Sequence, residues 1–158
     1  MFLKLLGASA LLISGVGFSY SLGQSASAML SQCDAWCSML RYIKLQVDCF
    51  AIPISQILSR CDRALLDGCG YRGEREPKDL RELIDGALWH DGETLAIVEG
   101  FASEFGKGYR EEQLRSCEYY CAQLENRRAR LASEIPSKKR LYTTLCLSSA
   151  AALVILFI

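Results

Sequence analysis

Apolar residues recur at three- and four-residue spacing through the middle of the chain, and this period is typical of amphipathic α-helices. No stretch alternates apolar and polar residues convincingly for a half-buried strand. The pattern predicts helices over residues 29–50, 54–66, about 77–88, 91–105 and 109–135. We therefore expect an all-α fold, in which residues 27–138 form a small antiparallel helical bundle.

The apolar stripe of each predicted helix defines its buried side. We expect Pro53 to end the first helix, Asp91 to cap the fourth, and Gly106 to stop it in a left-handed conformation. Pro77 suits a first-turn position, and Pro136 predicts a kink or a short break. The expected core positions are Met29, Cys33, Cys37, Leu40, Ile43, Val47, Ile54, Ile57, Leu58, Cys61, Leu65, Leu80, Leu83, Ile84, Ala87, Leu88, Leu95, Val98, Phe101, Phe105, Leu114, Cys117, Cys121, Leu124 and Leu131.

The C-terminal stretch, residues 141–158, contains no charged side chain. As a helix it would be roughly 27 Å long, close to the ~30 Å hydrocarbon core of a bilayer. Lys138, Lys139 and Arg140 stand directly before it, as cations do on the cytoplasmic side of a membrane helix. We predict a C-terminal transmembrane helix over 141–158. The alternative, a buried core helix, would usually show a polar face.

A second apolar run predicts an N-terminal transmembrane helix over residues 1–24, because no charged residue occurs between Lys4 and Asp34. Its small residues would let the C-terminal helix approach closely. The alternative is a secretory signal peptide cleaved after Ala26-Ser27-Ala28, with the mature protein outside the cell. The basic cluster before residue 141 favours an uncleaved hairpin with the helical domain in the cytoplasm.

The whole chain of 158 residues balances 18 Lys+Arg with 18 Asp+Glu, so its charge does not indicate nucleic-acid binding. The distribution is uneven near the C-terminal run. Residues 127–140 contain one acidic residue, Glu134, and six basic ones: Arg127, Arg128, Arg130, Lys138, Lys139 and Arg140. Anionic lipid headgroups are the expected partner of this cluster.

The sequence contains eight cysteines, of which two pairs lie four residues apart on one helix face. The four thiols of Cys33, Cys37, Cys117 and Cys121 allow three interpretations: core packing, a zinc site or disulfides. Their apolar helix positions favour core packing, and a cytoplasmic domain would disfavour disulfides. We therefore assign no metal ligand and no cofactor.

Residues 68–73 match the letters of the G-x-G-x-x-G nucleotide motif, but they follow a predicted helix instead of a strand, so we expect an ordinary loop. His90 is the single histidine and has only Asp91 beside it. We expect it at the C-terminal end of a helix, where its cationic form would interact favourably with the helix dipole. No residue is assigned a catalytic or cofactor-binding role. A small membrane enzyme using a cysteine or His90 is the weakest hypothesis.

A charged segment, made of the loop after the second predicted helix and the start of the third, could contact another protein. A solvated surface is the simpler interpretation, because exposed charges are common. Partner-binding residues therefore stay unassigned. The segment contains Arg72, Arg75, Glu76, Lys78, Asp79 and Glu82.

A family resemblance is carried by residues 3–8, Ile52-Pro53-Ile54, Trp89, Phe105-Gly106-Lys107-Gly108 with Gln113, and Leu141-Tyr142. In these features and in their order over nearly the whole length, the chain resembles the stage III sporulation protein AB family of endospore-forming bacteria. Two features depart from the family: Gly108 and Tyr109 replace a hydroxyl residue and an aspartate, and Cys49 replaces a frequent aromatic residue. The helix after Tyr109 therefore lacks a strong N-cap side chain.

The resemblance implies a non-enzymatic membrane platform of the channel complex between mother cell and forespore. The family is similar to the cytoplasmic domains of the inner-membrane platform proteins of type II secretion and type IV pilus machines. The implied partners are the ATPase of the system, stage III sporulation protein AA, and other proteins of the complex. The resemblance implies a multi-pass protein of the mother-cell membrane that faces the forespore. Whether the protein forms a homo-oligomer is left open. The alternative is an outward-facing or secreted, disulfide-bearing helical binding domain with a C-terminal anchor.

Overall fold

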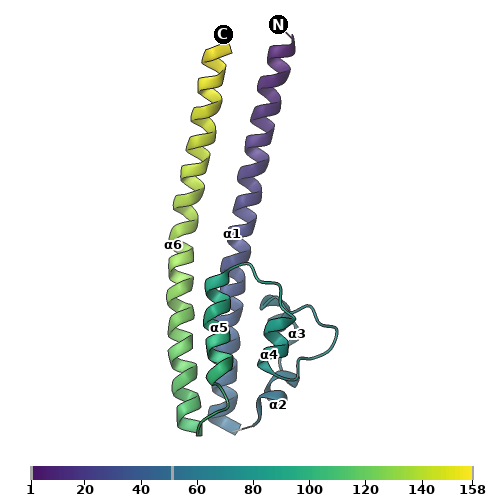
Figure 1. Ribbon diagram of the computed structural model, residues 1–158, viewed down its shortest axis with the longest axis vertical. Coiled ribbons are helices and arrows are strands. Elements are labelled where there is room, and N and C mark those ends of the chain that lie inside the picture. Colours follow the sequence, from purple (N-terminus) through teal and green to yellow (C-terminus); the bar gives the residue numbers. More distant parts are fainter. Residues whose placement is uncertain (1, 51, 158) are drawn as a thin grey trace. The chain divides into compact units, whose positions relative to one another are not determined.

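A computed structural model describes residues 2–50 and 52–157, with side chains for residues 25–50, 52–134, 144 and 148. These residues form six helices and no sheet (Figure 1), which confirms the predicted all-α class. One isolated antiparallel bridge joins Tyr71 and Ala87. The helices are α1 (Phe2–Phe50), α2 (Ile54–Ser59), α3 (Arg63–Gly68), α4 (Leu80–Asp85), α5 (Gly92–Glu104) and α6 (Arg110–Phe157).

The chain divides into two compact units: Met29–Arg130, and Met1–Ala28 together with Leu131–Ile158. Nearly all side chains of the predicted membrane helices, residues 1–24 and 141–158, lie outside the described residues. Among the helices that can be described, none has an apolar stretch long enough to cross a membrane.

Helix α6 continues without interruption through Pro136, so the prediction of a short break at this residue is wrong. Proline inside a helix removes one backbone hydrogen bond and crowds the preceding turn. A long helix can contain such a residue because the turns on both sides keep their own hydrogen bonds.

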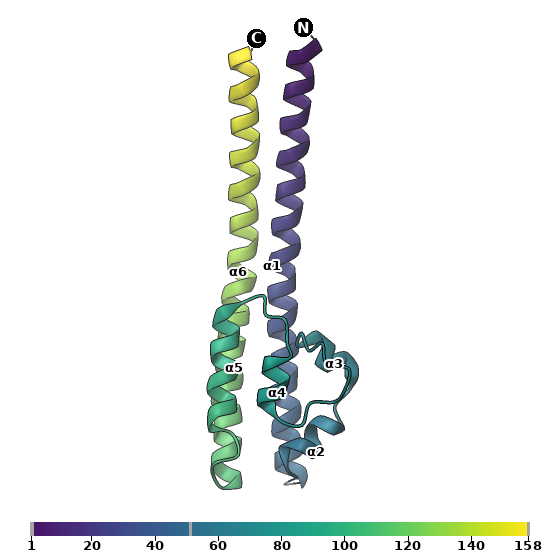
Figure 2. The same ribbon diagram turned by 45° about the vertical axis from the view of Figure 1, so that its right-hand side comes forward.

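Within the unit Met29–Arg130, α1 and α5 run in the same direction and α6 runs antiparallel to both (Figures 1 and 2). The ion pairs between α1 and α6 agree with this antiparallel arrangement. As the residue number of the α1 member rises, the residue number of its α6 partner falls. Water screens these exposed pairs, so they contribute more to the alignment of the helices than to the stability of the fold. The pairs are Asp34–Arg128, Arg41–Glu125, Lys44–Glu118 and Asp48–Arg110.

Most of the predicted stripe positions form the core. Leu40 and Ile43 of α1, Phe101 of α5 and Leu124 of α6 are fully buried. Full burial of such a side chain stabilises the fold by about 1.5–3 kcal/mol. The aromatic contact between Phe101 and Tyr120, with centroids 5.8 Å apart, joins α5 to α6. The core of this unit therefore lies where α1, α5 and α6 meet.

The single helix expected over residues 54–66 is wrong, because the chain forms α2 and α3 with a turn between them. The Asp62 side chain accepts a hydrogen bond of 2.9 Å from the Ala64 backbone N–H and starts a new helix there. The restart changes the buried face, so that Leu66 is 1% exposed while Leu65 is half-buried.

Helix α4 begins at Leu80, three residues after the predicted first-turn Pro77. Asp79 accepts from the Glu82 N–H at 2.7 Å, and Glu82 accepts from the Lys78 N–H at 2.8 Å. This reciprocal capping fixes the start of the helix and explains the difference from the prediction. The predicted burial of Leu88 is wrong, because this residue lies beyond the end of α4 and is 58% exposed.

The ends of α5 confirm two predictions. Asp91 caps the helix by accepting from the Thr94 N–H at 3.0 Å. Gly106 has φ +85°, the left-handed conformation expected after the helix. The start of α6 has no N-cap side chain at Tyr109, and the Glu112 carboxylate instead accepts from the Tyr109 N–H at 3.1 Å.

Candidate partner-binding site

The loop after α3 packs against α1 through backbone carbonyls. Trp36 Nε1 and Gln32 Nε2 both donate to the Cys69 carbonyl oxygen, at 3.1 and 2.9 Å. Gly70 follows with φ +97°, a conformation that glycine adopts at no steric cost. The segment 68–73 is thus a turn that follows a helix, as predicted, and not the strand-to-helix junction of a nucleotide site.

Gln32 holds three segments together from a buried position, 3% exposed. Besides its bond to Cys69, its amide donates to the Leu88 carbonyl at 2.6 Å and accepts from the His90 N–H at 3.0 Å. The sequence interpretation missed this residue because it is polar. A signal was present: Gln32 lies four residues before Trp36, on the same helix face.

Trp89, one of the residues that carry the family resemblance, packs against other parts of the fold. Its ring stacks on Trp36 with centroids 5.4 Å apart and an interplanar angle of 14°. Its Nε1 donates to the Ile84 carbonyl at 3.0 Å, which satisfies the polar end of a half-buried indole. Trp89 therefore fixes the α4–α5 connection against α1.

His90 does not lie at the C-terminal end of a helix, so that prediction is wrong. Helix α4 already ends at Asp85, and His90 directly precedes the N-cap Asp91 of α5. The reason is the early helix end, which places residues 86–90 in the connection to α5. The imidazole is exposed, whereas the Asp91 carboxylate faces Arg127.

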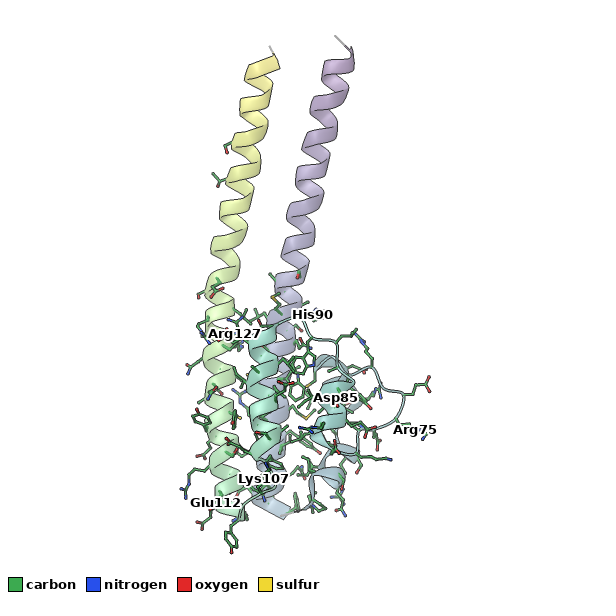
Figure 3. All side chains as sticks on the ribbon, in the orientation of Figure 1. Arg75, Asp85, His90, Lys107, Glu112 and Arg127 are labelled. Atoms are coloured by element: carbon green, nitrogen blue, oxygen red, sulfur yellow. The ribbon has the colours of Figure 1, made fainter. Side chains whose placement is uncertain are left out.

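Three of the six cations in the predicted lipid-binding cluster form ion pairs within the fold, and Figure 3 labels one of them, Arg127. Arg127 pairs with Asp91 and Glu93, Arg130 pairs with Glu93, and Arg128 pairs with Asp34. The Arg127 guanidinium beside Asp91 lowers the pKa of that carboxyl to about 2. The sequence groups these arginines with the membrane flank because their partners are distant along the chain. Lys138, Lys139 and Arg140 have side chains outside the described part of the chain.

The cysteines of the described residues are free thiols, and most of them are core residues. Cys33, Cys37 and Cys117 are buried, and the Cys33 thiol donates to the Leu124 carbonyl at 3.6 Å. Burial raises the pKa of the Cys117 thiol to about 12 and that of Cys61 to about 11. No three potential ligands come together as a metal site among the residues that can be described. The arrangement supports core packing.

The charged segment after α3 is exposed, and part of it has a structural role. Asp79 and Glu82 cap α4, and the Arg75 carbonyl accepts from the Tyr71 hydroxyl at 2.9 Å. One of the six predicted residues, Asp79, lines a cavity in the described part of the chain.

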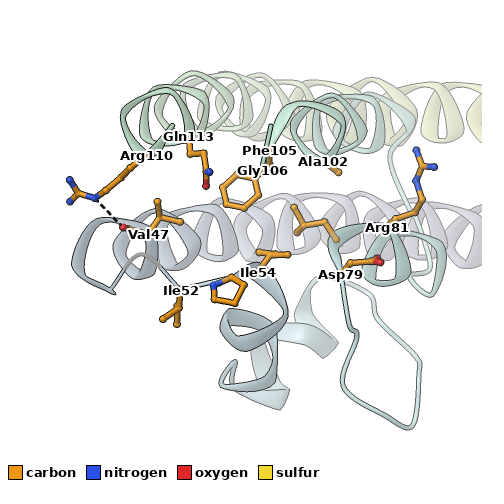
Figure 4. A pocket seen from close by; sticks show the side chains of 12 residues that line it. Val47, Ile52, Ile54, Asp79, Arg81, Ala102, Phe105, Gly106, Arg110 and Gln113 are labelled. Atoms are coloured by element: carbon orange, nitrogen blue, oxygen red, sulfur yellow. Dashed lines mark hydrogen bonds between the residues drawn. The ribbon is translucent and has the colours of Figure 1, made fainter. Parts of the chain in front are cut away.

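That cavity is a groove of about 620 Å³, formed where α1 and α5 end and α6 begins (Figure 4). Its lining combines apolar side chains with three charged residues and a glutamine. Apolar side chains that α1, α2, α4 and α5 bring together were not recognised from the sequence as one surface, because they belong to four separate stripes. The groove is lined by Val47, Ile52, Pro53, Ile54, Asp79, Leu80, Arg81, Ala102, Phe105, Gly106, Arg110 and Gln113.

The groove lies at the end of the unit that is remote from Met29 and Arg130. The pair Asp34–Arg128 marks one end, and the pair Asp48–Arg110, beside the groove, marks the other. Fourteen residues of helix separate the two α1 positions, which corresponds to about 21 Å. A partner can therefore reach the groove without approaching the residues where the chain enters and leaves this unit.

The described residues define an all-α protein that has a groove on its helical unit. A sequence profile of the family Stage III sporulation protein AB matches residues 4–158, so the chain belongs to this family. Membership confirms the resemblance and implies a role in the stage III sporulation channel complex; the family is not known as an enzyme. No curated protein and no solved structure matches the chain.

Proposed function

We propose that this protein is a non-enzymatic membrane platform of the sporulation channel complex, and that its helical domain docks the ATPase stage III sporulation protein AA. The observation that carries the proposal is the extent of the family match, which covers both apolar ends as well as the helical domain. In this proposal, residues 1–24 and 141–158 cross the membrane around the domain 27–138.

The charge distribution supports a cytoplasmic domain. Lys138, Lys139 and Arg140 directly precede the second apolar run, where cytoplasmic flanks carry cations. The ion pairs of Arg127, Arg128 and Arg130 reduce the cluster available to lipids to these three residues. The free thiols of the described cysteines also fit a reducing compartment and give no support to the disulfide-bearing alternative.

Topology is tested with paired reporters, one active only in the cytoplasm and one active only outside it. One insertion site is after Glu74, which is exposed and lies in a loop, and the other is after Ile158. We expect a cytoplasmic signal at Glu74 and an outside signal at Ile158. A cytoplasmic signal after Ile158 would contradict the hairpin.

Docking is tested by co-purification of the full chain, extracted in mild detergent, with the tagged ATPase. We expect a stoichiometric complex that survives washing at moderate salt. An unrelated membrane protein with a tail anchor of similar hydrophobicity is the control. Recovery of the ATPase no better than with this control would refute the docking role.

A further inference from the structure

We infer that the groove at the end of α1, α5 and α6 binds the apolar face of an amphipathic segment of the partner ATPase, with an aspartate or glutamate that pairs with Arg81. This inference rests on the proposed function and names the surface that the ATPase would use.

The shape and lining of the groove fit such a segment. Ile52 and Ile54, from one segment, and Phe105, at the end of α5, are half-buried lining residues, and Val47 and Leu80 are buried lining residues. A helix that binds in a groove inserts a few large apolar side chains, and a volume of about 620 Å³ can accept them. Phe50, 62% exposed at the end of α1, adds apolar surface at the same end of the unit.

The charges of the lining select the polar part of the partner. Arg110 donates to the Val47 carbonyl and pairs with Asp48, Gln113 donates to the Gly108 carbonyl, and Asp79 caps α4. Arg81 is exposed on α4 and, within the described residues, has no hydrogen bond or ion pair. It stands at the opposite end of the groove from Arg110 (Figure 4). The one lining charge that the fold does not use is therefore positive, and its complement is a carboxylate.

The test measures the affinity of the full chain in detergent micelles for the purified ATPase. Arg81→Glu reverses the unused charge, and Ile52→Asn removes an apolar contact outside any helix. Arg115→Glu is the matched control, because Arg115 is also exposed but lies two residues, or about 200°, around α6 from the groove-lining Gln113. Circular dichroism verifies that each variant keeps its helix content.

We expect Arg81→Glu to weaken binding at least about fivefold and Ile52→Asn to weaken it by a similar factor. Arg115→Glu should bind like the wild type. An aspartate or glutamate of the ATPase changed to arginine should restore part of the affinity of Arg81→Glu. If both groove variants bind like the wild type while the wild type binds well, the groove is not the site and the platform function stands. If the wild type itself does not bind, both proposals fail.

Discussion

Arg127 forms a bidentate ion pair with Asp91 that connects α6 to the start of α5. The Nε–Oδ2 distance is 2.9 Å and the Nη2–Oδ1 distance is 2.7 Å. The two side chains are 12% and 9% exposed, so the pair is largely shielded from water. The same carboxylate caps α5 and accepts from the Thr94 hydroxyl at 2.6 Å. One aspartate therefore controls both the start of a helix and its attachment to its neighbour.

Replacing Arg127 should destabilise the protein much more than replacing Arg128. Arg127→Met leaves the Asp91 carboxylate shielded from water without its cation, which we expect to lower the free energy of unfolding by about 3 kcal/mol. The Arg128 side chain is 55% exposed in its pair with Asp34, and Arg128→Met should change stability by less than about 1 kcal/mol. Thermal unfolding of the full chain, followed by circular dichroism in detergent, measures both. Equal losses would show that Arg127 is not a special contact.

The same pair makes stability depend on pH. The Asp91 pKa is lowered from 3.8 to about 2 in the folded protein, so the carboxylate stabilises the fold fully above pH 3.8. This contribution, on the order of 2 kcal/mol from the size of the shift, is lost as pH falls from about 4 to 2. We expect Asp91→Asn to be less stable than the wild type at pH 6, and the difference to shrink below pH 4. A constant difference down to pH 2 would contradict the assignment.

The helical part of the fold could be predicted because its signals are local. The stripes of α1, α5 and α6 follow the helical period, and the Asp91 cap and the Gly106 stop act within one turn of their own positions. The split between α2 and α3 also has a local signal, since Asp62 is a good N-cap residue, but the apolar stripe that runs across it favours one continuous helix.

The groove and the Gln32 contacts could not be predicted in this way, because they depend on how separate segments meet. The Gln32 side chain donates to backbone carbonyls that lie 37 and 56 positions further along the chain. Arg127 meets a carboxylate 36 positions away. A pattern along one helix shows which side is buried, but it does not show which loop or which charge lies opposite.

Alanine in place of two glycines should have opposite effects. A Cβ at Gly70 would lie 2.5 Å from Gln32 Nε2 and 2.6 Å from the Leu88 oxygen, in a backbone with φ +97°. We expect Gly70→Ala to lower the free energy of unfolding by at least about 2 kcal/mol. Gly92, the first residue of α5, has nothing within 4 Å of such a Cβ. Gly92→Ala should be neutral or raise stability by about 0.5 kcal/mol. Chemical denaturation compares the two variants, and a stable Gly70→Ala protein would contradict the described loop geometry.

Thiol modification separates the interpretations of the cysteines. Cys49 is exposed, whereas burial raises the pKa of Cys69 and Cys117 and keeps both as protonated thiols. In the native protein at pH 8, we expect an alkylating reagent to label Cys49 within minutes and to leave Cys69 and Cys117 unlabelled until denaturant is added. Peptide mass spectrometry assigns each site, so Cys146, whose side chain is not described, does not confuse the result.

The controls for this experiment are chelator and reductant. Core packing predicts that neither changes the labelling, because buried thiols are protected by the surrounding side chains and not by a metal or a bond. Faster labelling of Cys33, Cys37, Cys117 and Cys121 together after a chelator would indicate zinc, since removal of the ion frees its thiolate ligands. Labelling of a pair only after reduction would indicate a disulfide and would favour an outward-facing domain. Protection that ends only on unfolding is therefore the outcome that supports core packing of these thiols.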